Sequence, residues 1–346
     1  MSFQGLTFGV VREVMQAERR VAATPATVKK MVSAGGHVLV EAGAGVGSHF
    51  SDAEYEAAGA KVLADVEALF AQADVILKVK EPQPRPSHQK HEVDMMRAGQ
   101  CLVTFLHPAS PDNHELIRNL AARGVVSFTL DSVPRTSRAQ SMDALTSMST
   151  VAGYKAVLMA ADRLPKFMPM VGTAVGTLPP AKVLVLGAGV AGLQAIATAR
   201  RLGAVVQAAD VREEASTHAK SVGAKLIDLQ IPAEVAVGEG GYARTLPDEW
   251  LERERIILAE HVAQADLVIT TALVPGREAP MLVTEAMVES MVSGSVIVDI
   301  SIDQGGNCEV TEPGKIIERH GVSIYGTKNI PGMLPTSSTW MFANNI

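Results

Sequence analysis

Short apolar runs rich in β-branched residues alternate along the chain with segments of helical periodicity. In the first half these runs are LTFGVV, HVLVEA, DVILKV, CLVTFL and VVSFTL, starting at Leu6, His37, Asp74, Cys101 and Val125. The segments TPATVKKMVSAGG, SDAEYEAAGA and DNHELIRNLAARG lie between them and have Thr, Ser or Asp near a plausible N-cap. Strands that alternate with helices form parallel sheets, so the pattern predicts an α/β fold.

The same alternation resumes at Lys182 with KVLVLGAGVAGLQAIATARRLGAVVQAADVR, followed by AKLIDL, DLVITTAL, SVIVDISI and VSIYG. Residues 141–164 contain no proline and predict one long helix that joins the two series. Residues 167–181 contain three prolines and two glycines, so we expect a loop there. Residues 235–249 lack an apolar period and predict a long mobile loop. The chain is therefore expected to form two parallel-sheet domains joined by a long helix, with a cleft between them.

Composition narrows the class of protein. A length of 346 residues suits two domains of about 150 residues each. The formal net charge is −6 and no Lys/Arg cluster stands out, which argues against nucleic-acid binding. The two longest uncharged stretches are interrupted by Gly, Pro and polar residues, so we expect no direct membrane insertion. With 2 Cys and no signal-peptide pattern at the N-terminus, a cytoplasmic location is expected.

A glycine motif carries the first functional signal. The sequence GAGVAG, from Gly187 through Gly189, Val190 and Ala191 to Gly192, directly follows the predicted strand KVLVL and precedes a helix-forming run. The first glycine permits a tight turn, the second allows a pyrophosphate to approach, and the third lets the helix pack closely on the strand. The alternative is a glycine-rich turn without a cofactor. We predict a dinucleotide-binding Rossmann domain over residues 146–331 and an N-terminal α/β domain over 1–145, completed by 332–346.

An acidic residue follows at the distance expected for such a site. The strand VVQAAD ends at Asp210, 23 residues beyond Gly187, where a carboxylate would accept hydrogen bonds from a ribose diol. Asp210 would repel a 2′-phosphate, so NAD is the expected cofactor. Val211 and Arg212 follow directly and are expected to border the ribose, and the charge of Arg212 weakens the preference against NADP.

Longer stretches of the chain resemble the alanine dehydrogenase and proton-translocating transhydrogenase family. The stretches that carry this resemblance are RVAATP, EAGAGVGSHFSD, LKVKEP, GTLPPAKVLVLGAGVAGLQAIATARRLGA, ALVPGREAP and GSVIVDISIDQGGNCEVTEPGK, which together span essentially the whole chain. Within the family, PRTSRAQSMDALTSMSTVAGYKAV is similar to the NAD(H)-binding component (alpha subunit, domain I) of the transhydrogenase. The resemblance implies two Rossmann-like domains and binding of NAD.

The resemblance to the transhydrogenase component implies a set of site residues. Arg135, Gln140 and Asp143 match a loop that lies beside the nicotinamide, and GGYAR matches a mobile loop whose Gly241 and Tyr242 close over the cofactor. Ala272 and Leu273 are expected to contact the cofactor as well. The alternative for the first three residues is a surface ion-pair and helix-capping cluster.

This branch implies direct hydride transfer between NAD(H) and NADP(H), which needs close positioning of the two rings and no proton donor. The NADP(H)-binding and membrane subunits would be separate partners. We therefore expect a homodimer that is peripheral to the inner membrane through those partners and takes part in proton translocation only with them.

Four other residues resemble the substrate site of the alanine dehydrogenase branch. Arg20 could clamp a carboxylate, Lys80 could bond a keto oxygen, His107 could act as general acid and base, and Asp303 could orient the amine or the histidine. Each has an ordinary alternative, since His107 could satisfy a backbone group, Lys80 could be solvated and Asp303 could cap a turn. An NAD-dependent amino-acid dehydrogenase that reductively aminates a 2-oxo acid is therefore the alternative function, with a non-catalytic regulatory protein as a third. No metal site is expected.

Overall fold

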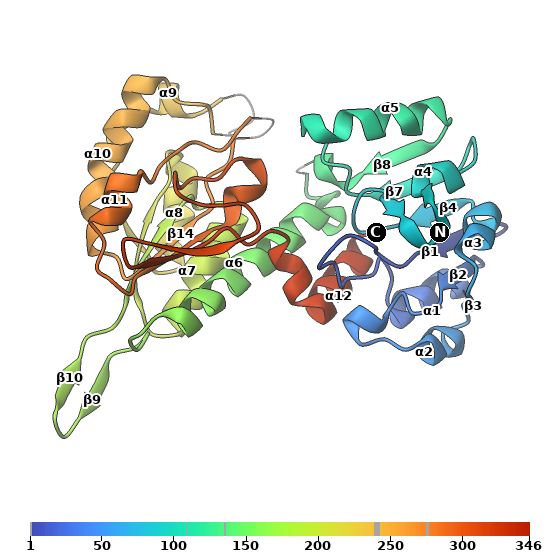
Figure 1. Ribbon diagram of the computed structural model, residues 1–346, viewed down its shortest axis with the longest axis horizontal. Helices are drawn as coiled ribbons and strands as arrows, with labels where there is room; N and C mark the ends of the chain where they lie inside the picture. The colour runs from blue at the N-terminus through green and yellow to red at the C-terminus, as the bar shows by residue number, and fades with distance from the viewer. Residues whose placement is uncertain (1, 109, 135, 239–242, 275–276) are drawn as a thin grey trace. The chain divides into compact units, whose positions relative to one another are not determined.

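The computed structural model describes residues 2–108, 110–134, 136–238, 243–274 and 277–346 (Figure 1). The chain divides into two compact units. Unit 1 comprises Met1–Met148 and Pro331–Ile346, and unit 2 comprises Ser149–Ile330. Each unit contains one main sheet with helices packed against it, so both are α/β.

Unit 1 contains a six-stranded parallel sheet. Its order is β3 (Lys61–Leu63), β2 (His37–Glu41), β1 (Thr7–Val10), β4 (Val75–Leu77), β7 (Cys101–Thr104) and β8 (Val126–Thr129). The order reverses between β1 and β4, the topological switch point of a doubly wound sheet, beside which ligands bind in such folds. A separate antiparallel pair, β5 (Pro84–Arg85) and β6 (Lys90–His91), lies outside this sheet.

The helices of unit 1 are α1 (Pro25–Ser33), α2 (Asp52–Ala57), α3 (Val66–Gln72), α4 (Glu92–Met95), α5 (His114–Ala122) and α12 (Pro335–Asn345). Thr24 and Ser51 form capping boxes at α1 and α2, which confirms both predicted helix starts. The expected Asp cap of α5 is wrong, because a 3₁₀ turn over Pro111–Asn113 comes first. The C-terminal α12 belongs to this unit because Phe342 is fully buried in its core.

Unit 2 contains a seven-stranded sheet with the same switch. Its order is β13 (Lys225–Leu226), β12 (Val205–Ala209), β11 (Lys182–Leu186), β14 (Leu267–Thr270), β15 (Val296–Asp299), β17 (Val322–Tyr325) and β16 (Ile316–Arg319). All pairs are parallel except β16 with β17. Strands β14 and β15 are buried along their whole length, as expected of strands covered on both faces. These sheets confirm the Rossmann-like fold class.

Helices α7 (Val190–Arg201), α8 (Glu213–Ser221), α9 (Ala233–Ala236), α10 (Asp248–Gln264) and α11 (Glu285–Glu289) lie in unit 2. The predicted long helix is α6 (Ala144–Arg163), which includes the boundary between the units. It begins three residues later than expected, because Gln140–Met142 form a 3₁₀ turn. Among the described helices, none is long and apolar enough to cross a membrane.

Two predicted loops differ from the structure. Within residues 167–181, β9 (Val171–Thr173) and β10 (Gly176–Leu178) form an antiparallel hairpin that projects from unit 2 (Figure 1). The prediction of a loop there is wrong, because the prolines flank the two strands instead of interrupting them. Within residues 235–249, Val237 and Ala243 form an isolated bridge and the last two residues belong to α10, while 239–242 lie outside the described residues.

Candidate functional site

The glycine motif forms a tight turn at the end of β11. Gly187 has φ +91°, a left-handed conformation that glycine adopts without strain, and its N–H donates to Ala209 O over 2.9 Å. A Cβ atom added to Gly192 would lie 1.9 Å from Gly187 O. The first glycine therefore permits the tight turn, and the third lets α7 pack closely on the end of β11, as the motif predicts.

The second glycine has a different environment. Gly189 is the N-cap residue of α7, and a Cβ atom added there would meet nothing within 4 Å. Leu193 N donates to Gly189 O over 2.8 Å, so the amides of Val190, Ala191 and Gly192 precede the first intrahelical hydrogen bond. Open space beside a helix N-terminus is what the approach of a pyrophosphate requires. The turn is therefore compatible with a dinucleotide.

Asp210 follows β12 and lies beside this turn. Its Oδ2 atom accepts hydrogen bonds from Ala188 N over 2.7 Å and from an Arg212 NH2 group over 2.9 Å, and its Oδ1 atom accepts from Arg212 N and Nε. The Asp210 side chain is 5% exposed and that of Arg212 is 23% exposed. The hydrogen bonds and charge of Asp210 raise the pKa of Arg212. The two residues thus form one partly buried ion pair, with Val211 half-buried between them.

The end of β14 forms the opposite side of the glycine turn. Thr271 Oγ1 donates to Gly187 O over 3.0 Å, and a Cβ atom added to Gly187 would lie 2.8 Å from Ala272 N. Ala272 therefore lies against the turn, while the neighbouring Leu273 is 40% exposed. The predicted cofactor residues Gly241 and Tyr242 lie outside the described residues.

The nicotinamide-loop candidates precede α6 in unit 1. Asp143 accepts hydrogen bonds from Thr146 N over 2.8 Å and from Thr146 Oγ1 over 2.7 Å. These contacts are those of a helix cap, the alternative named for this cluster. Gln140 is exposed in the 3₁₀ turn, and Arg135 lies outside the described residues.

The four dehydrogenase candidates lie in both units. Asp303 is exposed in the 3₁₀ helix Ile300–Gln304 of unit 2, whereas the other three belong to unit 1. Arg20 is buried, and its guanidinium donates to both carboxylate oxygens of Glu18 and to Met148 Sδ. The guanidinium that was expected to clamp a substrate carboxylate thus holds one from its own chain.

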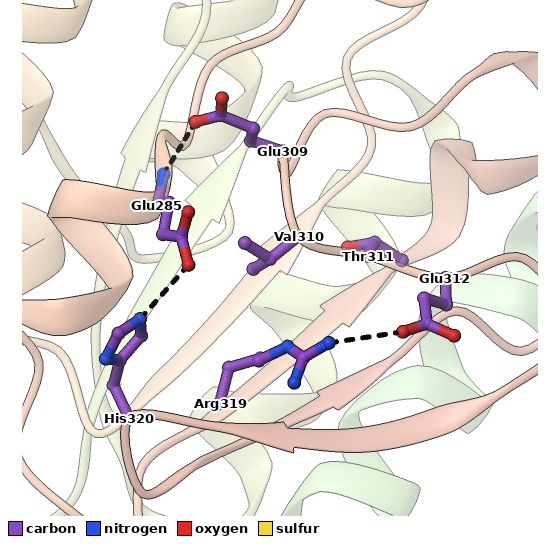
Figure 2. Close-up of a pocket in the computed structure, with 7 residues that line it drawn as sticks. All are labelled: Glu285, Glu309, Val310, Thr311, Glu312, Arg319 and His320. Atoms are coloured by element: carbon purple, nitrogen blue, oxygen red, sulfur yellow. Dashed lines mark hydrogen bonds and ion pairs between the residues drawn. The ribbon is translucent and has the colours of Figure 1, made fainter.

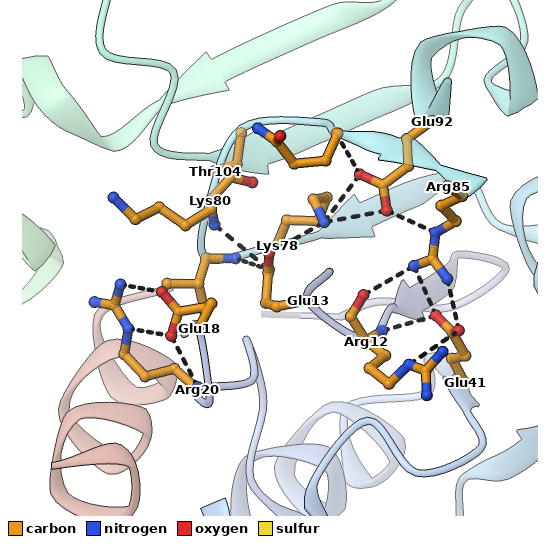
Figure 3. A network of polar contacts seen from close by, with 12 residues as sticks. Arg12, Glu13, Glu18, Arg20, Glu41, Lys78, Lys80, Arg85, Glu92 and Thr104 are labelled. Carbon is orange, nitrogen blue, oxygen red and sulfur yellow. Dashed lines mark hydrogen bonds and ion pairs between the residues drawn. The ribbon is translucent and has the colours of Figure 1, made fainter. Parts of the chain in front are cut away.

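Lys80 follows β4, where its backbone O accepts a hydrogen bond from Thr104 Oγ1 over 2.8 Å. Figure 3 shows its side chain extending away from Glu13, which contacts the Lys80 backbone N over 3.4 Å. Because Thr104 ends the adjacent strand β7, Lys80 and His107 are brought to neighbouring strand ends of unit 1.

His107 has an acidic partner that the sequence did not indicate. Its Nδ1 atom lies 2.7 Å from Asp131 Oδ1, and its backbone N donates to Asp131 Oδ2 over 2.9 Å. The ring stacks on Phe105 at an interplanar angle of 4°, and the side chain is 37% exposed. Burial alone would raise the pKa of Asp131, but the hydrogen bonds and charge of His107, with Thr129, lower it to about 2. A carboxylate that binds Nδ1 fixes the ring and leaves Nε2 for proton transfer.

A buried charge network in unit 1 also escaped prediction (Figure 3). Lys78, which is 0% exposed, lies 3.2 Å from Glu13 Oε2 and 3.1 Å from Glu92 Oε2. Arg85 donates to Glu92 Oε1 over 2.8 Å and to both carboxylate oxygens of Glu41. Burial lowers the pKa of Lys78, but Glu13 and Glu92 together outweigh it and raise that pKa. The signal in the sequence is a lysine within the buried run DVILKV, where a charge needs a partner.

Unit 2 also has a surface pocket, which is lined by residues that were not predicted as site residues (Figure 2). It is lined by Glu285, Glu309, Val310, Thr311, Glu312, Arg319 and His320. Its charged groups pair with one another, since His320 Nε2 lies 3.3 Å from Glu285 Oε1 and Arg319 NH2 lies 3.6 Å from Glu312 Oε1. None of the predicted cofactor residues lines it. No group of three or more His, Cys, Asp or Glu that could hold a metal ion occurs among the described residues.

Comparisons with known proteins cover both units. The family model "Alanine dehydrogenase/PNT, N-terminal domain" matches residues 9–152, and the corresponding C-terminal domain model matches 156–346. In Rhodospirillum rubrum, the first part of the NAD(P) transhydrogenase alpha subunit is 42% identical over 342 residues, which are 99% of this chain and 88% of that protein. The transhydrogenase subunit alpha of Cereibacter sphaeroides is also 42% identical, but this chain spans only 64% of its length.

The more distant curated relatives include alanine dehydrogenases. Alanine dehydrogenase of Bacillus subtilis is 36% identical over 347 residues, covering 98% of this chain and 83% of that protein.

Among solved structures, a transhydrogenase from Sinorhizobium meliloti matches with a TM-score of 0.85 and 44% identity, covering 98% of this chain and 90% of the other. An L-alanine dehydrogenase matches with a TM-score of 0.79 and 32% identity, covering 98% and 87%. The chain therefore belongs to the alanine dehydrogenase/PNT family, whose members are NAD-dependent oxidoreductases.

Proposed function

We propose that this chain is the NAD(H)-binding component of a proton-translocating NAD(P) transhydrogenase. The observation that carries the proposal is its 42% identity, over 99% of its length, to the Rhodospirillum rubrum transhydrogenase alpha-subunit protein. Solved transhydrogenase and alanine dehydrogenase structures both match almost the whole chain, and the transhydrogenase match has the higher identity and TM-score.

The residues at the carboxyl end of β11 fit a bound NAD(H). Gly189 leaves open space at the α7 N-terminus for the pyrophosphate, and Asp210 lies at the end of the next strand, where the adenosine ribose binds in this fold. In the bound cofactor, the nicotinamide would supply or accept a hydride.

Asp210 favours NAD over NADP. Its carboxylate would accept a hydrogen bond from a ribose hydroxyl and repel a 2′-phosphate. Arg212 Nε and NH2 are bound to Asp210, so a 2′-phosphate would have to displace this carboxylate to bind the guanidinium. We therefore assign NAD(H) to this chain and NADP(H) to a partner subunit.

Direct hydride transfer between two nicotinamides needs no proton donor, so the work of the protein is positioning. Gln140 is exposed and would hold the carboxamide and ribose side of the ring, while Arg135 and Asp143 would fix the loop. Asp143 would act indirectly, because its carboxylate already caps α6 through Thr146 and so fixes the start of the helix behind Gln140.

Membrane and NADP(H)-binding subunits complete the proposed enzyme, and the chain itself is proposed to form a homodimer. The exposed apolar side chains of the hairpin β9–β10 support dimerisation, since Val175 is 99% exposed and Leu178 is 49% exposed. Such a surface is costly to leave in water.

The proposal is tested by reconstitution. The purified chain is mixed with NADH and an oxidised NADP analogue, with and without the NADP(H)-binding subunit from its own organism. Turnover that depends on the partner is the expected result. Oxidation of NADH with ammonium and pyruvate or another 2-oxo acid, in the absence of any partner, would contradict it.

A specific observation favours a second candidate, an alanine dehydrogenase-like reductive amination of a 2-oxo acid. That reaction needs a proton as well as a hydride, and the His107–Asp131 pair provides an oriented imidazole after β7, the strand next to the one that Lys80 follows. Against it, the Arg20 guanidinium is bound by Glu18, so a substrate carboxylate would have to displace an internal ion pair. We therefore rank this candidate second.

The dehydrogenase candidate has its own test. NADH oxidation is followed with ammonium and a panel of 2-oxo acids for the wild-type chain, His107→Ala and a control, His114→Ala. His114 is exposed and contacts Pro108 O, so it is chemically matched but outside the pair. Activity lost only in His107→Ala supports this candidate, and the absence of activity in the wild-type chain excludes it for the substrates tested.

A further inference from the structure

The peptide of Ala272 lies directly against the first glycine of the dinucleotide turn. Thr271 N donates to Leu186 O over 2.8 Å, and Thr271 Oγ1 donates to Gly187 O over 3.0 Å. A Cβ atom on Gly187 would lie 2.8 Å from Ala272 N and 3.0 Å from Ala272 Cα. There is no spare room between the Gly187 turn and the end of β14, so a displacement of Ala272 towards the turn would displace the turn as well.

Asn307 binds both polar backbone atoms of Ala272, the N–H and the carbonyl oxygen. Its Oδ1 atom accepts from Ala272 N over 3.0 Å, and its Nδ2 atom donates to Ala272 O over 2.9 Å and to Pro280 O over 2.8 Å. Asn307 is 0% exposed. A side-chain amide has one acceptor oxygen and two donor hydrogens, and all three are used here.

Asn307 is itself held in place by Asp299. The Asn307 N–H donates to Asp299 Oδ2 over 2.9 Å, and Asp299 Oδ1 accepts from Thr270 Oγ1 over 2.8 Å. Gly306 has φ +84°, and a Cβ atom there would lie 2.7 Å from Asp299 Oδ2, so only glycine allows this approach. The ends of β14 and β15 are thus tied together through Asn307.

These contacts change the role expected of Ala272. Its N–H is bonded to Asn307, and its carbonyl oxygen accepts from Asn307 and from Ser301 Oγ over 3.2 Å. Because the N–H is already used, this peptide contributes the shape of the site instead of a donor to the cofactor.

We propose that Asn307 is a positioning residue for dinucleotide binding, which fixes the Ala272 peptide against the Gly187 turn. The proposal rests on the proposed binding of NAD(H) at that turn. Only an amide satisfies the three neighbouring groups. A carboxylate at position 307 would face two carbonyl oxygens, and an apolar side chain would leave all three groups unpaired.

The test is a titration of the purified full chain with NADH, followed by cofactor fluorescence, beside thermal unfolding of each variant. The variants are Asn307→Asp and Asn307→Ala, and the control is Val322→Ala. Val322 is 0% exposed in the same half of the unit 2 core, so its truncation lowers stability but leaves the hydrogen bonds between Asn307 and Ala272 in place. We expect both Asn307 variants to bind NADH at least about tenfold more weakly, because a displacement of about 1 Å is enough to disrupt a site. Val322→Ala should stay within twofold of the wild type.

Affinity within twofold of the wild type in folded Asn307 variants would overturn the proposal. An equal loss of affinity in Val322→Ala would overturn it too, since it would reduce the effect to general destabilisation. Should neither Asn307 variant fold, Asn307→Gln keeps an amide but moves it by one methylene group away from the positions that bond Ala272 and Pro280, and unchanged NADH affinity in that variant would likewise overturn it. Failure of the wild-type chain to bind NADH would overturn the proposed function, and this inference with it.

Discussion

The Nδ1 atom of His107 lies 2.7 Å from Oδ1 of Asp131, and the other oxygen of that carboxylate accepts hydrogen bonds from Leu106 N and His107 N, each over 2.9 Å. One carboxylate therefore binds both the ring and the backbone of a residue whose φ is +47°. Such a φ costs a non-glycine residue about 1–3 kcal/mol, which the contacts with Asp131 offset.

Replacing Asp131 with Asn should lower the free energy of unfolding at pH 7 by about 1–2 kcal/mol. The pKa of Asp131 is lowered from 3.8 to about 2 in the folded chain. A carboxyl group whose pKa is lowered by folding stabilises the fold at pH values above its pKa in the unfolded chain. Solvent screens this pair, because the His107 side chain is more than a third exposed, so the loss is smaller than the full linkage value. The difference in free energy of unfolding between the wild type and Asp131→Asn should shrink as the pH falls from about 4 towards 2. Urea unfolding curves recorded at a series of pH values measure it. A difference that stays constant over that range would contradict the assigned cause.

The glycine motif provides a matched pair of substitutions. Gly192→Ala should lower the melting temperature strongly, because its Cβ atom would lie 1.9 Å from Gly187 O. Gly189→Ala should leave the melting temperature nearly unchanged, because its Cβ atom meets nothing within 4 Å, yet it should weaken NADH binding by occupying the space that a pyrophosphate needs. Thermal unfolding and NADH titration measure the two effects. Normal NADH affinity in Gly189→Ala would argue against binding at this turn.

The glycine turn was predicted from the sequence, whereas the residues that bind His107 and Ala272 were not. The difference lies in how far apart in the sequence the interacting residues are. The glycine turn was predictable because its motif, with the left-handed Gly187 and the close contact between Gly192 and Gly187 O, falls within six consecutive residues. The partners Asp131 and Asn307 could not be predicted, because each contact depends on which strands become neighbours in the sheet. His107 follows β7 and Asp131 follows β8, while Ala272 follows β14 and Asn307 follows β15. No residue spacing encodes those pairings.

Strand β3 and helix α3 were not among the predicted elements. Helix α2 has 6 residues and α3 has 7, so length does not separate them; the start of α2 is marked in the sequence by the capping box of Ser51 and Glu54. The hairpin β9–β10 was missed because prolines near a strand favour a loop when the strand pairing is unknown.

Replacing Lys78 with Met should destabilise the chain by about 3–5 kcal/mol, because it leaves the buried carboxylates Glu13 and Glu92 without their shared cation. The control is Lys90→Met, since the Lys90–Glu67 pair is exposed on both sides and should contribute less than about 1 kcal/mol. Chemical unfolding of the two variants measures the difference. Similar stabilities would mean that the buried network does not depend on Lys78.

Glu254 on α10 should make stability fall as the pH rises towards 8. Burial, together with the negative charge of Asp210, raises the pKa of Glu254 from 4.5 to about 7. The folded chain therefore binds a proton that the unfolded chain has already released, and ionisation at higher pH works against folding. Glu254→Gln should raise the free energy of unfolding by about 1–3 kcal/mol at pH 8 and change it little at pH 5. Exposed Glu252 provides the control, and a gain from Glu252→Gln of the same size would exclude burial as the cause.

The hairpin β9–β10 provides the test of the proposed homodimer. An isolated two-stranded hairpin is only marginally stable in water, and all three residues of β10 are exposed here, so a second copy of the chain would supply the missing contacts. The double substitution Val175→Asp and Leu178→Asp should therefore shift the chain from dimer to monomer in sedimentation velocity. The matched control is Ile256→Asp on α10, because Ile256 is 67% exposed but lies far from the hairpin in sequence. A dimer that survives the double substitution, or dissociates equally in the control, would show that the hairpin is not the interface.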